Sequence, residues 1–321
     1  MSKKNMLLAI FLIVLFSSTY SFASEPYPSK DIEIIVPFAA GGGLDLMSRT
    51  LAVQLSDILG TQVIVVNKPG AGGSVGTTLA LKSKPDGYTL VTVSPSSILF
   101  SPNFKKVEYD PLKDISYIAG WVNQPLGIQV LAESQFKNLN DLLTFAKNNP
   151  GKIKYGASFN GYGHIYMEAI AKERGIKWSI IPSAGDGEML PSLLGGHTDV
   201  STMAVRWVSY ARTGQIRPLA LFCEKRLSSF PETPVLNEFG FDFPMPAASL
   251  IGIGAPKGVP ADIVGKLERA FQVALDSADF KKVAETQSLE IWFRNSSEFK
   301  KTAEEGFQGI GEMAKRLGLK E

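Results

Sequence analysis

The sequence predicts an α/β protein with two lobes, each built from a mainly parallel sheet flanked by helices. Strand patterns alternate with helix patterns along the chain, which is typical of parallel sheets. The chain is also longer than one hydrophobic core usually supports, since single cores stop growing near about 250 to 300 residues. Glycine-rich loops recur between a predicted strand and a helix start, at 41–43, 67–74, 156–164 and 182–187.

The first 23 residues are predicted to be a cleavable signal peptide. Lys3 and Lys4 precede an apolar run over 6–16, and Ser21-Phe22-Ala23 has the small-x-Ala pattern of a cleavage site. An N-terminal membrane anchor is the alternative, but the run is shorter than the ~20 apolar residues that a bilayer requires. We therefore expect an exported, soluble chain that begins after Ala23.

The mature chain is expected to be electrically neutral. Removal of the signal peptide removes two of the 33 basic residues and none of the 31 acidic ones, which leaves 31 of each. A neutral protein has no general electrostatic attraction to nucleic acid or to an anionic membrane. Two histidines and one cysteine are too few for a His/Cys metal cluster or an internal disulfide, so we expect no metal. Cys223 lies in an apolar run and is expected to be buried and inert.

The first glycine-rich loop is the strongest candidate for a ligand site. A β-branched run ends at Pro37, three glycines follow, and apolar residues then recur at helical spacing from Leu44. The first turn of such a helix has N–H groups without intrahelical partners and about half a positive charge. An anion can bind there without any lysine or arginine. A simple chain reversal is the alternative for a glycine triplet.

The rest of the first lobe is predicted to contain strands over 63–66 and 88–93 and a helix over 75–82. The loop over 67–74 lacks the Gly-Lys-Ser/Thr ending of a P-loop and does not fit G-x-G-x-x-G, so nucleotide binding is not expected. The last of these strands ends at Ser94-Pro95, which has the composition of a helix start.

The second lobe is predicted to begin after the break at Asn123-Gln124-Pro125. Its strands are expected at 127–131, 152–155, 176–181, 199–203 and 216–222, and its helices at 139–147, 165–174, 188–194 and 205–212. Helices over 263–275 and 297–317 are expected to return to the first lobe. The predicted domains are therefore 24–124 with 252–321, and 125–251. The glycine-rich loops would meet at the cleft between them, because open α/β sheets bind ligands outside the carboxyl ends of their strands.

The motifs resemble those of one family, in order and over nearly the whole mature chain. They are similar to the substrate-binding proteins of tripartite tricarboxylate transporters, the Bug receptors. The segments that carry the resemblance are Pro37-Phe38 with Gly41-Gly42-Gly43 and Asp45, then 67–73, 85–90, Gly161-x-Gly163-His164, 194–199, 214–220, 231–234 and Ala255-Pro256.

The resemblance implies a type II-like periplasmic-binding-protein clamshell that works in the periplasm. Such a receptor binds a small organic carboxylate in the interdomain cleft and delivers it to the membrane permease subunits of a tripartite transporter. It is a monomer, without a cofactor, and is not an enzyme. Backbone amides and hydroxyls of opposed loops hold the carboxylate. In this chain the contacts would come from Phe38, Ala39, Gly42, Gly43, Leu44, Asp45, Ser94 and Ser96, and from Ser158, Asn160, Gly161, His164, Ala184 and Gly185.

Several positions depart from the family pattern. Leu44 stands where threonine is usual, Ser183 replaces an aromatic residue, and Leu250 stands where another aromatic residue is common. Leucine at position 44 lacks the hydroxyl donor of threonine and gives the expected cleft an apolar surface there. The identity of the ligand therefore does not follow from the resemblance.

Arg206 is a further candidate because it follows the predicted strand over 199–203, at the expected edge of the cleft. Its planar guanidinium could grip the second carboxylate of a diacid. The alternative is a solvated arginine that covers Trp207 or the helix surface. His164 likewise either lines the cleft or serves as a structural histidine.

Two other functions remain open at this stage. A periplasmic hydrolase or isomerase could use the same scaffold, although the segment 156–160 lacks the final glycine of a G-x-S-x-G elbow. Asp45 and Asp199 follow glycine-rich turns but are more simply explained as helix-start and turn residues. A receptor that presents its ligand to a membrane sensor kinase is the other alternative.

Overall fold

A computed structural model describes residues 26–123, 126–223, 225–245, 250–287 and 289–319. The predicted signal peptide lies outside this range. Within it, none of the helices is both long and apolar enough to cross a membrane.

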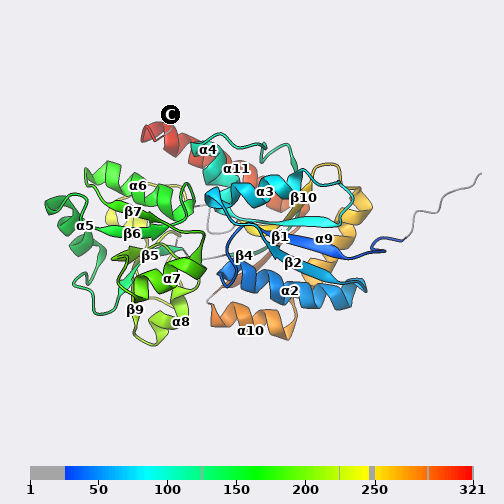
Figure 1. The fold of residues 1–321 in the computed structure, drawn as a ribbon, viewed down its shortest axis with the longest axis horizontal. Helices are drawn as coiled ribbons and strands as arrows, with labels where there is room; N and C mark the ends of the chain where they lie inside the picture. Colours follow the sequence, from blue (N-terminus) through cyan, green and yellow to red (C-terminus); the bar gives the residue numbers. More distant parts are fainter. Residues whose placement is uncertain (1–25, 124–125, 224, 246–249, 288, 320–321) are drawn as a thin grey trace, which may run out of the picture.

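The first lobe is a sheet covered by helices on both faces (Figure 1). Its strand order is β11-β4-β10-β3-β1-β2. The strands are β1 (Ile32–Val36), β2 (Val63–Asn67), β3 (Thr89–Val93), β4 (Ile115–Asn123), β10 (Ile251–Pro256) and β11 (Glu290–Arg294). One face packs against α2 (Gly43–Leu59), α9 (Ala261–Leu275) and α10 (Ala278–Thr286). The other face carries η1 (Ala71–Gly73), α3 (Ser74–Leu81), η2 (Ser96–Phe100), α4 (Ser101–Phe104) and α11 (Ser296–Arg316).

The second lobe is a smaller sheet with the order β7-β6-β8-β5-β9. Its strands are β5 (Gly127–Leu131), β6 (Lys154–Ala157), β7 (Ser179–Pro182), β8 (Val200–Ser201) and β9 (Ile216–Leu221). Its helices are α5 (Leu139–Asn148), α6 (Tyr162–Arg174), α7 (Asp186–Leu194), α8 (Trp207–Arg212) and the short η3 (Leu236–Phe239). The predicted two-lobed α/β fold is therefore confirmed.

The sheets are mixed, which corrects the expectation of mainly parallel pairing. In the first lobe β1 pairs in parallel with β2 and β3, but β10 pairs antiparallel with both β3 and β4. The reason is the route of the chain: β10 returns from the second lobe and enters the sheet against the direction of its neighbours. In the second lobe β6 is parallel to β7 and β8, whereas β5 is antiparallel to β8 and β9.

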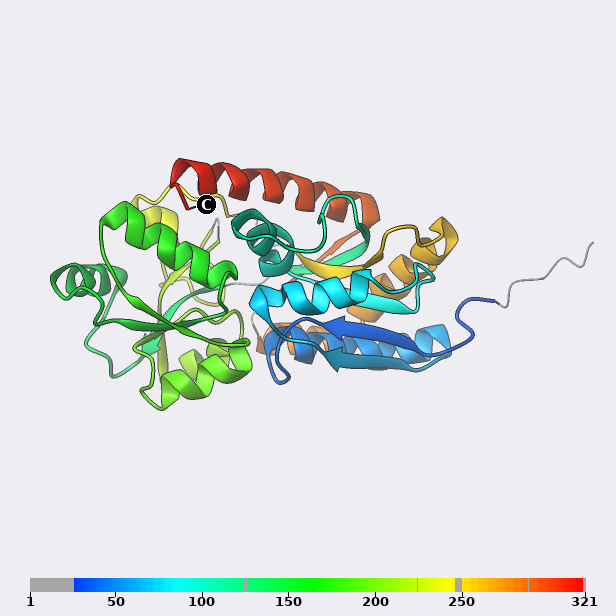
Figure 2. The ribbon, with the colours of Figure 1, turned by 45° about the horizontal axis from the view of Figure 1, so that its top comes forward.

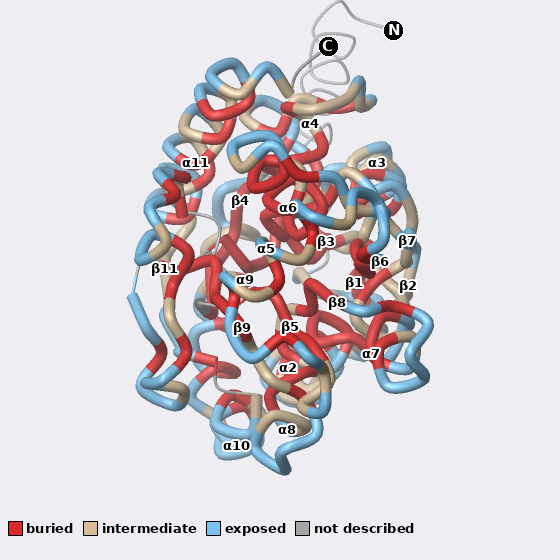
Figure 3. The backbone as a smooth tube through the Cα atoms, turned by 90° about the vertical axis from the view of Figure 1, so that its left-hand side faces the viewer, coloured by how far each residue is buried: buried red, intermediate tan, exposed pale blue. Residues whose placement is uncertain are grey.

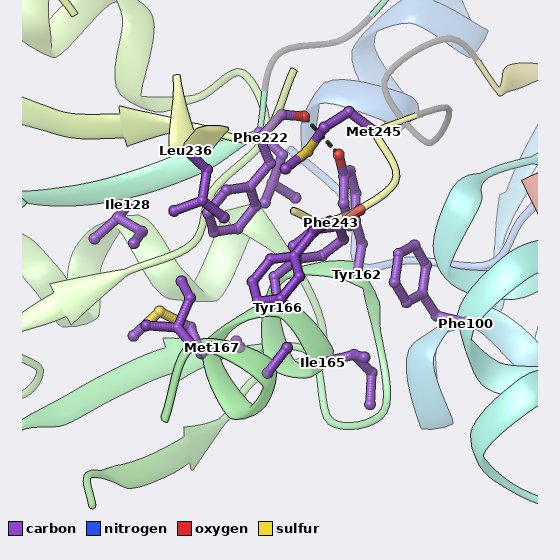
Figure 4. Close-up of a cluster of buried hydrophobic side chains, with 14 of the residues drawn as sticks. Phe100, Ile128, Tyr162, Ile165, Tyr166, Met167, Phe222, Leu236, Phe243 and Met245 are labelled. Atoms are coloured by element: carbon purple, nitrogen blue, oxygen red, sulfur yellow. Dashed lines mark hydrogen bonds between the residues drawn. The ribbon is translucent and has the colours of Figure 1, made fainter. Parts of the chain in front are cut away.

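A hydrophobic core runs from one lobe into the other. Figure 3 shows buried residues concentrated in the strands and exposed residues on the outer helices. Helix α11, which runs along the top of Figure 2, packs on η2. There Phe100 of the first lobe stacks on Tyr162 of the second, with ring centroids 4.9 Å apart (Figure 4). The Tyr162 hydroxyl in turn donates to the backbone oxygen of Phe222 at 2.7 Å. This shared core holds the starts of η2 and α6 opposite each other.

Candidate ligand-binding site

The two lobes enclose a cavity of about 80 Å³. One buried water needs about 10 to 15 Å³ by such a measure, so the space fits several water-sized groups and suits a small molecule. The loops after β1 and β3 form one wall, and the starts of α6 and α7 with the loop after β8 form the other. The lining residues are Phe38, Ala39, Gly42, Gly43, Leu44, Asp45, Ser94, Pro95, Ser96, Leu126, Ser158, Tyr162, Gly163, Gly185, Asp186, Met189, Thr202, Ala204 and Ile251.

The structure gathers most of the expected residues around this cavity. Those at the lining are Phe38, Ala39, Gly42, Gly43, Leu44, Asp45, Ser94, Ser96, Ser158 and Gly185. Those outside the lining are Asn160, Gly161, His164, Ala184 and Arg206. Ala184 instead lines a neighbouring hollow that shares Phe38 and Ser158 with the cavity.

The amino end of α2 faces the cavity without a side-chain cap. Its N-cap residue is Gly42, which offers no hydrogen bond to the first turn, and Gly42, Gly43 and Leu44 all line the cavity. The backbone amides of this turn are therefore placed to bind an anion.

Asp45 lies in the same turn, but its carboxylate is already engaged. It accepts hydrogen bonds from the Gly41 backbone N–H and from Asn67 Nδ2, each at 2.9 Å, and pairs with Arg49 Nε at 2.9 Å. Burial acts to raise the pKa of Asp45, but the bonds from Arg49, Gly41 and Asn67 outweigh it and hold the pKa below its ordinary value. Asp45 therefore shapes the loop and stays ionised.

His164 stabilises the loop before α6 through a hydrogen bond to its backbone. The Asn160 backbone N–H donates to His164 Nδ1 at 3.0 Å, and the imidazole stacks on Phe159 with centroids 4.8 Å apart. Burial lowers the pKa of His164 to about 4, so the ring is neutral at pH 7 and can accept this bond. Of the two alternatives for His164, lining the cleft or stabilising the fold, the geometry favours the second.

Asp186 is the main lining residue that sequence reasoning missed. It opens α7, and its carboxylate accepts the backbone N–H groups of Ala204 at 3.0 Å and Val205 at 3.1 Å. Burial raises the pKa of Asp186, while these hydrogen bonds oppose the rise because they favour the ionised form. Its position directly after Gly185 in a glycine-rich loop was the available signal. Pro95, within the expected segment 94–96, also lines the cavity, and the other lining residues not expected are Leu126, Tyr162, Gly163, Met189, Thr202, Ala204 and Ile251.

Arg206 does not line the cavity, although it lies close to Asp186. Its backbone N–H lies 3.5 Å from Asp186 Oδ2, and its Nε is buried without a hydrogen-bond partner. Among the described residues that line the cavity, the charged ones are Asp45 and Asp186, both acidic. An anionic ligand would therefore depend on backbone amides and hydroxyl groups.

No group of three or more His, Cys, Asp or Glu side chains in the described part of the chain is placed to hold a metal ion.

Comparison with known proteins identifies the family of this chain. A profile of the family described as "Tripartite tricarboxylate transporter family receptor" (TctC) matches residues 47–319. Protein BugT of Bordetella pertussis is 32% identical over 282 residues, which cover 85% of this chain and 86% of BugT.

Solved structures show the same fold. The periplasmic binding protein BugD superposes with a TM-score of 0.82 at 26% identity, over 92% of this chain and 99% of BugD. MatC of Rhodopseudomonas palustris, solved with bound malate, superposes with a TM-score of 0.82 at 22% identity, over 89% and 99% of the two chains. The resemblance seen in the sequence is confirmed: this chain belongs to the TctC family of tripartite tricarboxylate transporter receptors.

Proposed function

We propose that this protein is a periplasmic receptor that binds a small organic carboxylate between its lobes and delivers it to the permease of a tripartite tricarboxylate transporter. The observation that carries the proposal is the uncapped amino end of α2, which lines the cavity between the lobes together with serine residues of both lobes. Such a site offers N–H and O–H donors to an anion, and hydrogen bonds are stronger inside a protein than in water.

Family membership supports the transport role, the periplasmic location and the permease partner. MatC with bound malate is a relative of the same fold that holds an organic acid. The position of His164 supports a receptor rather than an enzyme, because its Nδ1 already accepts a bond from the loop and the residue lies outside the cavity lining. We further propose that 24–124 with 252–321 and 125–251 are the two moving domains, and that the protein acts as a monomer.

The experiment is a thermal-shift screen of the purified mature chain against mono-, di- and tricarboxylates and aromatic acids. A ligand present at 100 times its dissociation constant should add about 2.7 kcal/mol to the free energy of unfolding. Calorimetry on the hits gives the affinity, and chromatography of the mixture after incubation tests for turnover. Stabilisation with full recovery of the acid supports the receptor. Consumption of the acid would support the hydrolase or isomerase instead, and no stabilisation by any acid would contradict both.

Delivery needs a separate measurement. Proteoliposomes that contain the large and small permease subunits should take up the labelled acid only when this protein is added. Binding without uptake would favour the alternative of a ligand-presenting partner for a membrane sensor.

A further inference from the structure

We propose that Asp186 makes this site selective for acids that also carry a hydrogen-bond donor, a hydroxyl or an ammonium group, at the end that faces the Asp186 carboxylate. The same side chain disfavours a second carboxylate there. This inference rests on the proposed function, because it assumes that one carboxylate of the ligand binds at the amino end of α2.

The first step is the place that Asp186 occupies. Between β8 and α8 the chain turns, and the consecutive backbone N–H groups of 204–206 point toward one spot. The Asp186 carboxylate fills that spot: Oδ2 lies 3.0 Å from the nitrogen of Ala204, 3.1 Å from that of Val205 and 3.5 Å from that of Arg206. Consecutive backbone N–H groups of this kind form a concavity that binds anions. In this protein the anion is a side chain of the protein itself.

The second step is the charge around the cavity. Asp45 pairs with Arg49 at 2.9 Å. Asp186 is the other acid that lines the cavity, and the described residues give it no ion pair at hydrogen-bond distance. Burial raises the pKa of Asp186, and the positive charge of Arg206 only opposes this rise without lining the cavity. The wall formed by the second lobe therefore carries an acid without an ion-pair partner, whereas the amino end of α2 carries the partial positive charge of the helix.

The third step is the capacity for hydrogen bonds that Asp186 retains. Its Oδ1 accepts one long bond, from the Ala204 backbone N–H at 3.2 Å, and a carboxylate oxygen can accept two. A ligand hydroxyl or ammonium group could donate to this oxygen. A second ligand carboxylate would bring no donor to this oxygen and would set two hydrogen-bond acceptors against each other.

The test compares matched acids of equal length, from four to eight carbons: the ω-hydroxy acid, the ω-amino acid and the α,ω-diacid. Calorimetry on the wild-type protein should show weaker binding of the diacid than of its hydroxy or amino partner at each length that binds. In Asp186→Ser, which keeps a short acceptor for the N–H groups of 204–206, the ratio of diacid to hydroxy-acid affinity should rise by about tenfold or more, the scale of one charge-assisted interaction.

Asp141→Asn is the matched control. Asp141 is also an acid in the first turn of a second-lobe helix and accepts a backbone N–H, from Lys137 at 2.8 Å, but it lies outside the cavity. This variant should leave the ratio unchanged. Circular dichroism checks that each variant folds, and Asp186→Asn replaces Asp186→Ser if the latter does not.

Equal or tighter binding of diacids by the wild-type protein, or an unchanged ratio in the folded Asp186 variant, would overturn this inference and leave the proposed function in place. Binding of no acid in the panel or in the wider screen would overturn the proposed function and the inference together.

Discussion

The hydroxyl oxygen of Ser96 in the first lobe accepts a hydrogen bond from the backbone N–H of Tyr162 in the second lobe, at 2.9 Å. Tyr162 is the first residue of α6, and both residues line the cavity. The bond therefore joins the two walls of the site directly, next to the space that a ligand would fill. We expect opening of the lobes to break this bond, so that Ser96 contributes to the stability of the closed form.

We expect Ser96→Ala to weaken ligand binding by about 0.5 to 1.5 kcal/mol, the net value of one neutral hydrogen bond, because the closed form loses this bond. The free energy of unfolding of the unliganded protein should change less. Calorimetry with a ligand from the screen gives the first quantity, and urea denaturation gives the second. Ser179→Ala is the control: Ser179 is exposed and bonds to Gly151 within its own lobe at 3.1 Å. An affinity equal to wild type in Ser96→Ala would contradict the expectation.

Gly187 offers a second test of closure. A Cβ atom at this position would lie 2.7 Å from the backbone oxygen of Ala40 in the opposite lobe, which is too close for any real contact. We expect Gly187→Ala to fold normally, because Gly187 lies in the first turn of α7, but to hold the lobes apart and lower the affinity. Small-angle scattering should show the wild-type protein contracting with ligand, as in hinge closure, and the variant contracting less.

Gly265→Ala serves as the control for that experiment, since a Cβ atom there meets only the end of the Arg269 side chain, at 3.4 Å. A radius of gyration that ligand leaves unchanged in the wild-type protein would argue against domain closure itself.

The sequence predicted the parts of the site that depend on local chain geometry. The start of α2 was predictable because a β-branched strand, a glycine triplet and a helical apolar pattern follow one another in Ile34 to Leu44, and no distant contact is needed to make that junction. Asp186 was not singled out, because its role depends on backbone N–H groups of 204–206, which only the folded lobe brings to it.

The same limit applies to the sheets. The antiparallel entry of β10 between β3 and β4 follows from the path of the chain between lobes, which no local pattern reveals. Strand β4 was also missed. Its sequence is interrupted by Gly120, which is explained by packing: a Cβ atom there would lie 2.8 Å from the ring of Phe299 in α11. A glycine inside a strand usually weakens it, but here only glycine leaves room for the side chain of Phe299, which is far away in the sequence.

Ser158 and Asn160 were expected to act alike, and the structure separates them. Ser158 lines the cavity, so Ser158→Ala should weaken ligand binding by about 0.5 to 1.5 kcal/mol if its hydroxyl donates to the ligand. Asn160 lies outside the lining and has a left-handed backbone, with φ of 57°. Asn160→Ala should therefore lower the free energy of unfolding by about 1 kcal/mol, since alanine tolerates this conformation poorly, whereas Asn160→Gly should not. Equal stability of the alanine and glycine variants would contradict this account.

His164 should make stability depend on pH. Its pKa is about 4 in the folded protein against 6.5 for an ordinary histidine, so the unfolded chain binds the proton first as pH falls. The contribution is complete above pH 6.5 and is lost progressively between pH 6.5 and 4, up to about 3 kcal/mol. Urea denaturation at several pH values should show His164→Gln losing less stability over this window than wild type. His197→Gln, at an exposed histidine, should follow wild type. Parallel pH profiles for wild type and His164→Gln would rule out this role.

Arg206 decides between two ways of holding an acid. If its guanidinium bound a second carboxylate, Arg206→Gln would weaken the binding of a diacid by about 1.5 to 3 kcal/mol and leave the binding of the monoacid analogue unchanged. The structure favours the other outcome, because Arg206 does not line the cavity, and the amides that a distal carboxylate could use are bonded to Asp186. We therefore expect the affinity difference between diacid and monoacid to change by less than about 0.5 kcal/mol in Arg206→Gln, within the usual range for a side chain outside the binding contacts. Calorimetry with both acids on both proteins measures this difference. A selective loss for the diacid would show that the guanidinium reaches the ligand when the lobes close on it, and would return Arg206 to the site.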